Sequence, residues 1–173
     1  MIIIIVGKSC SGKTSAREHL ESKGMIGFEA SKYMKEYINK YSLSPEELFI
    51  KFGRNFVSKL IFQEIKEAGG DNSFVISGLR TVEEIEFLKN KSKVKIIGIN
   101  VSDETCFQRN LEKNREDMLK KFSDFYSKRI DFNSKLGLNK IFQNYIDFWI
   151  DNEGDIENLK SKLDEFIEKN ETA

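Results

Sequence analysis

The chain has 173 residues, 39% of them hydrophobic and 32% charged, which is typical of one globular domain and excludes a disordered chain. Its 28 basic residues balance its 28 acidic residues, which argues against a protein that coats nucleic acid or an anionic membrane. Two cysteines imply no disulfide framework, and one histidine builds no metal site with them, so we expect a cytoplasmic location.

The hydrophobic pattern predicts strands alternating with helices. In chain order we expect a strand at residues 2–6, a helix at 13–23, a strand at 25–29, helices at 32–40 and 45–68, a strand at 74–77, a helix at 82–90, a strand at 94–101, a helix from 103, a charged segment at 114–121, a helix at 122–136, a strand at 145–150 and a helix at 156–169. This alternation predicts a single three-layer α/β domain over residues 1–173 with a mostly parallel sheet.

Three local signals strengthen these assignments. Residues 2–6 read Ile-Ile-Ile-Ile-Val, a run that suits a central strand buried on both faces and is too short to span a membrane. Ser44 with Glu47, and Thr81 with Glu84, have the spacing of capping boxes that start helices. Gly53 marks a break within the predicted helix at 45–68.

A complete G-x-x-x-x-G-K-[ST] motif connects the first predicted strand to the first predicted helix. Its residues are Gly7, Lys8, Ser9, Cys10, Ser11, Gly12, Lys13 and Thr14. The glycines allow successive backbone N–H groups to point inward, and the helix N-terminus faces the same point, so the loop should cradle the phosphates of ATP. We expect Lys13 to contact the β- and γ-phosphates and Thr14 to be the protein ligand of Mg²⁺.

Other motifs decide between classes of protein that contain this loop. A GTPase requires D-x-x-G after its third strand, but the only such string begins at Asp151, near the end of the chain. A motor ATPase requires acidic residues at the end of a strand, whereas the strand at 74–77 is followed by Gly78. A small phosphotransferase acting on nucleotide substrates remains.

The arginines are the candidate phosphate contacts. Six of the 28 basic residues are arginine and the other 22 are lysine, so arginine positions are candidates for planar, bidentate contacts. Arg80 follows the strand at 74–77, at the edge of the sheet where open α/β folds bind ligands. The remaining candidates are Arg54, Arg109, Arg115 and Arg129.

The phosphate motif, Gly78-Leu79-Arg80 and the arginine-containing segment 109–117 resemble nucleoside monophosphate kinases and dephospho-CoA kinases. The run from Ser77 to Glu86 is more similar to an adenylate-kinase-like family of small P-loop proteins, many of them archaeal. Further similarities to that family lie at Arg115-Glu116-Asp117, Leu136-Gly137-Leu138 and Asn152-Glu153-Gly154. The resemblance covers nearly the whole chain in the same order.

This resemblance implies a three-layer P-loop kinase fold with five parallel strands in the order 2-3-1-4-5 and a helical lid. It implies an acceptor cleft lined by helices within residues 30–68 and a lid at 109–121. ATP and Mg²⁺ would bind at the phosphate loop, with Arg109 and Asn152 beside the nucleotide. Arg80, and with it Arg54, would hold the acceptor. Lys13, Arg115 and Arg129 would neutralise the transferred phosphoryl group.

Three residues depart from the pattern of these kinases. Ser31 and Met34 stand where such kinases commonly carry an acceptor-site Asp and Arg, and Ser77 replaces an Asp that helps to organise Mg²⁺. We expect an ATP-dependent kinase that phosphorylates a small phosphorylated acceptor, with a nucleoside monophosphate as the first choice. A dephospho-CoA-kinase-like activity and a nucleotide sensor with little turnover are the alternatives. The sequence leaves the oligomeric state open.

Overall fold

The sheet has five parallel strands. The computed structural model describes residues 1–112 and 120–171. The strand order is β2-β3-β1-β4-β5, which confirms the predicted topology. The strands are β1 (Ile2–Gly7), β2 (Ile26–Glu29), β3 (Phe74–Ser77), β4 (Val94–Asn100) and β5 (Phe148–Asp151).

The first strand occupies the centre of the sheet and is buried on both faces. Ile4 pairs in register with Ile76 of β3 on one side and with Ile96 of β4 on the other. Side chains alternate between two hydrophobic clusters, with Ile4 in one and Ile3 in the other. Each cluster is covered by helices, which explains why the strand carries no polar residue.

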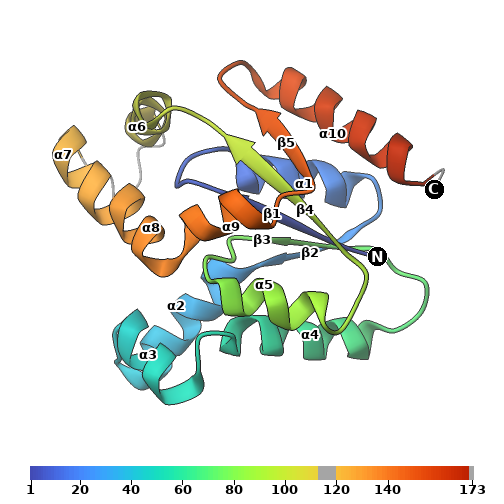
Figure 1. The fold of residues 1–173 in the computed structure, drawn as a ribbon, viewed down its shortest axis with the longest axis horizontal. Helices are drawn as coiled ribbons and strands as arrows, with labels where there is room; N and C mark the ends of the chain where they lie inside the picture. The colour runs from blue at the N-terminus through green and yellow to red at the C-terminus, as the bar shows by residue number, and fades with distance from the viewer. Residues whose placement is uncertain (113–119, 172–173) are drawn as a thin grey trace.

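Helices cover both faces of the sheet (Figure 1). Helices α1 and α10 pack on one face, and α4, α5 and α9 pack on the other. In residues 1–112 and 120–171, no helical segment combines the length and the apolar character that a bilayer span requires. The helices are α1 (Lys13–Ser22), α2 (Ala30–Tyr41), α3 (Pro45–Phe52), α4 (Phe56–Ala68), α5 (Val82–Lys89), α6 (Asp103–Glu112), α7 (Phe122–Phe125), the π-helix η1 (Tyr126–Asp131), α8 (Phe132–Leu136), α9 (Leu138–Asn144) and α10 (Ile156–Glu171).

The local start and stop signals lie where the sequence predicts them. Both capping boxes form, with Ser44 capping α3 and Thr81 capping α5. Gly53, with φ of 87°, ends α3 and separates it from α4. These boundaries were predictable because each depends on contacts within one turn of helix.

The segment after Lys121 differs from the prediction in three ways. Residues 126–131 form a π-helix within the predicted helix at 122–136. Gly137 ends α8 but also begins α9, a helix that the sequence did not indicate. The last strand starts at Phe148, later than predicted, because Tyr145 is still the C-cap of α9. Asp147, just before the strand, donates its backbone N–H to the Ile96 carbonyl oxygen of β4, and its carboxylate accepts from the Ile96 N–H.

Candidate functional site

The loop between β1 and α1 is held in a tight curve by small residues. A Cβ atom on Gly7 would lie 2.4 Å from Ser11 Oγ, and Gly12 has φ of 106°, so both positions favour glycine. Cys10 also adopts a left-handed conformation, with φ of 64°. The loop leads directly into the N-terminus of α1, which favours an anion at this point.

Lys13, the first residue of α1, folds back over this loop. Its Nζ atom donates hydrogen bonds to the carbonyl oxygens of Gly7, at 2.9 Å, and Lys8, at 2.6 Å. Thr14 follows it and, like Lys13, lines a polar cavity in front of the loop. The ammonium and the hydroxyl are therefore already positioned beside the loop.

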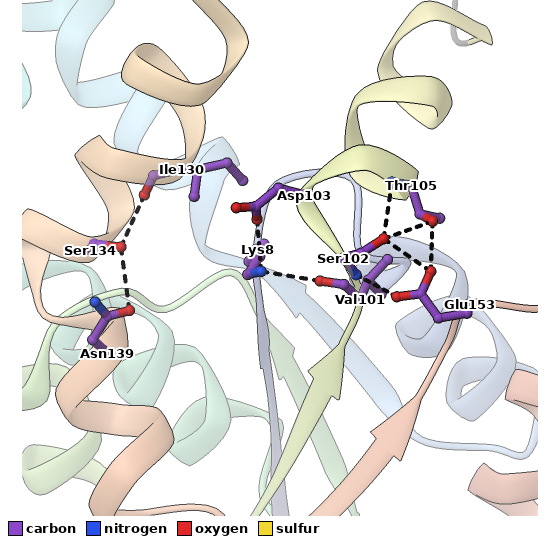
Figure 2. Close-up of polar contacts among 9 residues, drawn as sticks. All are labelled: Lys8, Val101, Ser102, Asp103, Thr105, Ile130, Ser134, Asn139 and Glu153. Atoms are coloured by element: carbon purple, nitrogen blue, oxygen red, sulfur yellow. Dashed lines mark hydrogen bonds and ion pairs between the residues drawn. The ribbon is translucent and has the colours of Figure 1, made fainter. Parts of the chain in front are cut away.

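The Lys8 side chain ties the loop to the start of α6. Its Nζ atom lies 2.7 Å from Asp103 Oδ1 and donates to the carbonyl oxygen of Val101 at 3.1 Å (Figure 2). The predicted contact between Lys8 and ATP would thus have to come from the backbone of Lys8, because its ammonium already has partners.

The loop after β5 supports the other side of the phosphate loop. The buried Asn152 side chain donates from Nδ2 to the carbonyl oxygen of Ser11 at 2.8 Å. Arg109 of α6 donates to the carbonyl oxygens of Asn152, at 2.8 Å, and Gly154, at 3.1 Å. These residues, with Cys10 and others, line a cavity of about 250 Å³. The structure therefore brings together the residues predicted to lie beside the nucleotide.

Glu153, which lies between Asn152 and Gly154, links the β5–α10 loop to the start of α6. Its carboxylate accepts hydrogen bonds from the Ser102 backbone N–H and from the Thr105 hydroxyl (Figure 2). These bonds, led by the one from Thr105, lower the pKa of Glu153. The phosphate loop, α6 and the β5–α10 loop thus form one hydrogen-bonded unit.

A polar cavity of about 190 Å³ lies in front of the phosphate loop. It joins the loop to the carboxyl ends of β2 and β3 and to α2, α6 and η1. Four cationic side chains and one carboxylate, Glu29, line it, so the cavity is matched to anions. Its lining residues are Ser9, Cys10, Gly12, Lys13, Thr14, Ser15, Glu29, Ser31, Lys35, Ser77, Gly78, Arg80, Asn110 and Arg129.

Arg80, from the turn between β3 and α5, also lines this cavity. Its backbone N–H donates to Glu84 Oε2 at 2.9 Å, which fixes the turn between β3 and α5. Burial lowers the pKa of the Arg80 guanidinium, and nearby Arg129 lowers it further, while Glu84 opposes the shift. A desolvated guanidinium beside a second one favours a bound anion.

Arg129 reaches the cavity from the π-helix η1. A π-helix changes the angular spacing of side chains within a helix and is frequent at functional sites. The buried Asn133, one turn later in α8, donates from Nδ2 to Ser9 Oγ at 3.1 Å. The helix that carries Arg129 is thereby attached to the phosphate loop itself.

Arg54, a predicted acceptor contact, is not among the described residues that line this cavity. Arg54 pairs with Glu83 at 3.0 Å and donates to the carbonyl oxygen of Leu136 at 2.6 Å, so it joins the turn between α3 and α4 to α5 and α8. Its contact with an acceptor stays a prediction. Arg115 and most of the predicted lid at 109–121 lie outside the described residues.

Sequence reasoning missed Lys35, Asn110 and Asn133. Lys35 is one of 22 lysines, but it shares a face of α2 with Ser31 and Ile38, at spacings of four and three residues. That face could have been found once Ser31 was placed at the site. Nothing in the sequence indicates Asn110 and Asn133, because their positions depend on how α6 and α8 cross the loop.

The residues present suit Mg²⁺ bound together with a nucleotide. No group of three or more histidine, cysteine, aspartate or glutamate side chains in the described part of the chain could hold a metal by itself. Mg²⁺ commonly takes one or two protein ligands, with phosphate oxygens and waters completing its octahedron. The Thr14 hydroxyl in the anion-binding cavity fits that arrangement.

The fold is the P-loop kinase fold that the resemblance in the sequence implies. Shikimate kinase from Aquifex aeolicus superposes with a TM-score of 0.58 at 20% identity, covering 98% of each chain. Shikimate kinase from Bacteroides thetaiotaomicron superposes with a TM-score of 0.64 at 18% identity, covering 97% of this chain and 98% of that one. At these low sequence identities the structural similarity shows the fold alone.

Archaeal proteins are similar in sequence. A UPF0200 protein of Thermococcus sibiricus is 26% identical over 183 aligned positions, covering 98% of this chain and 95% of that protein. A UPF0200 protein of Staphylothermus marinus is 29% identical over 126 residues, covering 69% of this chain and 63% of that protein. No protein-family model matches the chain. These similarities agree with the resemblance to a largely archaeal family seen in the sequence.

Proposed function

We propose that this protein transfers the γ-phosphoryl group of ATP to a small phosphorylated acceptor. The observation that carries the proposal is one cavity with Lys13 and Thr14 at the phosphate loop and with Lys35, Arg80 and Arg129 around it. Two phosphate groups brought together repel each other strongly, and four cations against one carboxylate offset that repulsion.

In this proposal each cationic residue has a role at one of the two anions. Backbone N–H groups of residues 7–14 and Lys13 bind the β- and γ-phosphates of ATP. Arg80 holds the phosphate of the acceptor. Arg129 and Arg115 neutralise charge on the group in transit. Thr14 holds Mg²⁺, which withdraws charge from the phosphate oxygens. Arg109 and Asn152 lie beside the rest of the nucleotide.

The transfer is a single in-line displacement. A lone pair on an acceptor phosphate oxygen forms the new bond to the γ-phosphorus while the bond from that phosphorus to the β–γ bridging oxygen breaks, which releases ADP. A phosphomonoester has a second pKa near 6, so at pH 7 its oxygen needs no general base. This removes the need to assign one to Glu29, which accepts a hydrogen bond from Ser31 and lies 3.8 Å from Arg17.

A coupled assay of ADP release tests the proposal. The acceptor panel contains nucleoside monophosphates, dephospho-CoA and simple phosphomonoesters. We expect acceptor-dependent release that falls about 10²- to 10³-fold in Lys13→Ala. Lys59→Ala is the control, because Lys59 is exposed on α4 and lines neither the polar cavity nor the cavity beside Asn152. Equal rates in the two variants would contradict the proposal.

A nucleotide sensor is the second candidate. Ser77 ends β3 inside the cavity, where related kinases commonly carry an aspartate that organises Mg²⁺, and this favours slow turnover. Tight MgATP binding that no acceptor in the panel converts into ADP release would support the sensor in place of the kinase.

A further inference from the structure

A second cavity, of about 180 Å³, adjoins the polar one. The two cavities share five lining residues, including Lys35, Arg80 and Arg129, so these cations stand at their boundary. Beyond this boundary the lining is almost wholly apolar and comes from α2, α3, α4 and α8. The apolar lining residues are Ala30, Met34, Ile38, Pro45, Phe49, Val57, Phe132 and Leu136.

This apolar chamber offers few groups that could recognise a nucleobase. Glu84 is the polar residue that lines it without also lining the polar cavity, and Glu84 Oε2 already accepts bonds from the backbone N–H groups of Arg80, at 2.9 Å, and Thr81, at 3.0 Å. A base carries several donors and acceptors along its edge, and burying them without partners is unfavourable. Met34 adds to this mismatch, because it stands where related kinases commonly carry an acceptor-binding arginine.

The boundary is suited to a phosphate group. Arg80 is partly buried, and no described residue forms an ion pair with its guanidinium or with the Lys35 ammonium within 4.0 Å. Arg129 brings a third positive charge to the same place. A dianionic phosphomonoester matches this charge better than a singly charged carboxylate does.

We propose that the acceptor is a phosphomonoester with an apolar body, such as an alkyl or aryl phosphate, rather than a nucleoside monophosphate. Its phosphate lies among Lys35, Arg80 and Arg129, and its body fills the chamber between α2, α3, α4 and α8. The inference rests on the proposed function, since it places the acceptor phosphate beside the phosphate loop.

Calorimetry on a series of ligands tests the acceptor class without requiring turnover. The protein is first saturated with Mg²⁺ and a non-hydrolysable ATP analogue, so that the nucleotide site is filled. Methyl, butyl, hexyl and phenyl phosphate are then titrated beside AMP and ribose 5-phosphate. We expect affinity to rise about fourfold per added methylene until the chamber is full. Tighter binding of AMP than of hexyl phosphate, or affinity independent of chain length, would overturn the inference.

Matched variants separate the phosphate group from the apolar body. Ile38→Asn makes the chamber polar and should reduce the gain per methylene at least twofold, whereas Ile50→Asn makes the same change at an exposed position of α3 and should leave it unchanged. Met34→Gln repeats the test where Ile38→Asn fails to fold. Arg80→Gln should weaken every phosphomonoester about equally and keep the gain per methylene. An undiminished gain in affinity per methylene in both Ile38→Asn and Met34→Gln would contradict the placement of the apolar body in this chamber.

The failure of this inference can be distinguished from the failure of the proposed function. Hexyl phosphate that binds as expected but stimulates no ADP release supports the acceptor class and contradicts the kinase activity. Phosphorylation of AMP in preference to hexyl phosphate supports the kinase activity and overturns the apolar acceptor.

Discussion

At the scale of single residues, the phosphate loop depends on side chains that lie outside it. Asn152 supports the loop through the Ser11 carbonyl oxygen, and Asn133 contacts Ser9. A Cβ atom on Gly12 would lie 2.5 Å from Asn152 Nδ2, so Gly12 and Asn152 fit each other closely. The loop therefore receives its shape from the β5–α10 loop and α8 as well as from its own glycines.

Asn152→Ala should destabilise the protein and weaken MgATP binding. It removes a buried hydrogen bond and leaves the Ser11 carbonyl oxygen without its partner, which costs about 1–3 kcal/mol of the free energy of unfolding. Urea denaturation measures the first effect and calorimetry the second. The control is Asn144→Ala, which removes an exposed bond within α9 and should change stability by no more than about 0.5 kcal/mol. Equal losses in the two variants would contradict the supporting role of Asn152.

At the scale of elements, α1 and α10 are joined by a charged contact at the surface. Asp164 Oδ1 of α10 lies 2.7 Å from Nε2 of His19, in the last turn of α1, and 3.1 Å from Nζ of Lys23, the C-cap of α1. The hydrogen bond with His19, followed by the one with Lys23, lowers the pKa of Asp164. This carboxyl therefore stabilises the folded state only while it is ionised.

The contact contributes to the free energy of unfolding, and the direction in which this contribution changes with pH is known. Because the pKa of Asp164 is lower in the folded state, its contribution is complete above the unfolded value of about 3.9 and is lost as the pH falls through the folded value. We expect Asp164→Asn to lower the urea midpoint at pH 7, and this difference should shrink as the pH falls below about 3.9. Glu165→Gln, at an exposed neighbouring position, is the control. A difference that persists undiminished at pH 3 would contradict the assignment.

Elements defined by local signals were predictable, and those defined by packing were not. The strand at residues 2–6, both capping boxes and the break at Gly53 follow from neighbouring residues, and all are confirmed. The π-helix and α9 could not be predicted from neighbouring residues, because a π-helix has no local sequence signal and α9 has only seven residues.

The same distinction holds at the candidate site. The phosphate motif and Arg80 were identified from their places after strands, where the fold itself brings residues together. The directions of the Lys8 and Arg54 side chains could not be predicted, because they depend on partners far along the chain, Asp103 for Lys8 and Leu136 for Arg54. Lys35 was missed because only the packing of α2 distinguishes it from other surface lysines.

At the scale of the whole molecule, β1 holds the two hydrophobic clusters together. Ile4 is fully buried, with strands on both sides and helices packed on its face of the sheet. Ile4→Ala should lower the free energy of unfolding by about 2–5 kcal/mol, because neighbours in a parallel sheet cannot collapse into the cavity. Urea denaturation measures it. Ile50→Ala, at a side chain 86% exposed, should change stability by no more than about 0.5 kcal/mol. A comparable loss in both would contradict the central role of β1.

The central position of β1 also affects how the chain can fold during its synthesis. Ile2 pairs with Phe74 of β3 and with Val94 of β4, so during synthesis β1 lacks its first neighbour until Phe74 has emerged and its second until Val94 has emerged. Before Phe74 emerges, the five consecutive aliphatic residues of β1 and both of its backbone edges have no neighbouring strand to pair with. The phosphate loop that follows β1 cannot take its final shape until Asn152, which supports it from just beyond β5, has also emerged. Binding of ATP during translation would therefore report that the sheet has been completed.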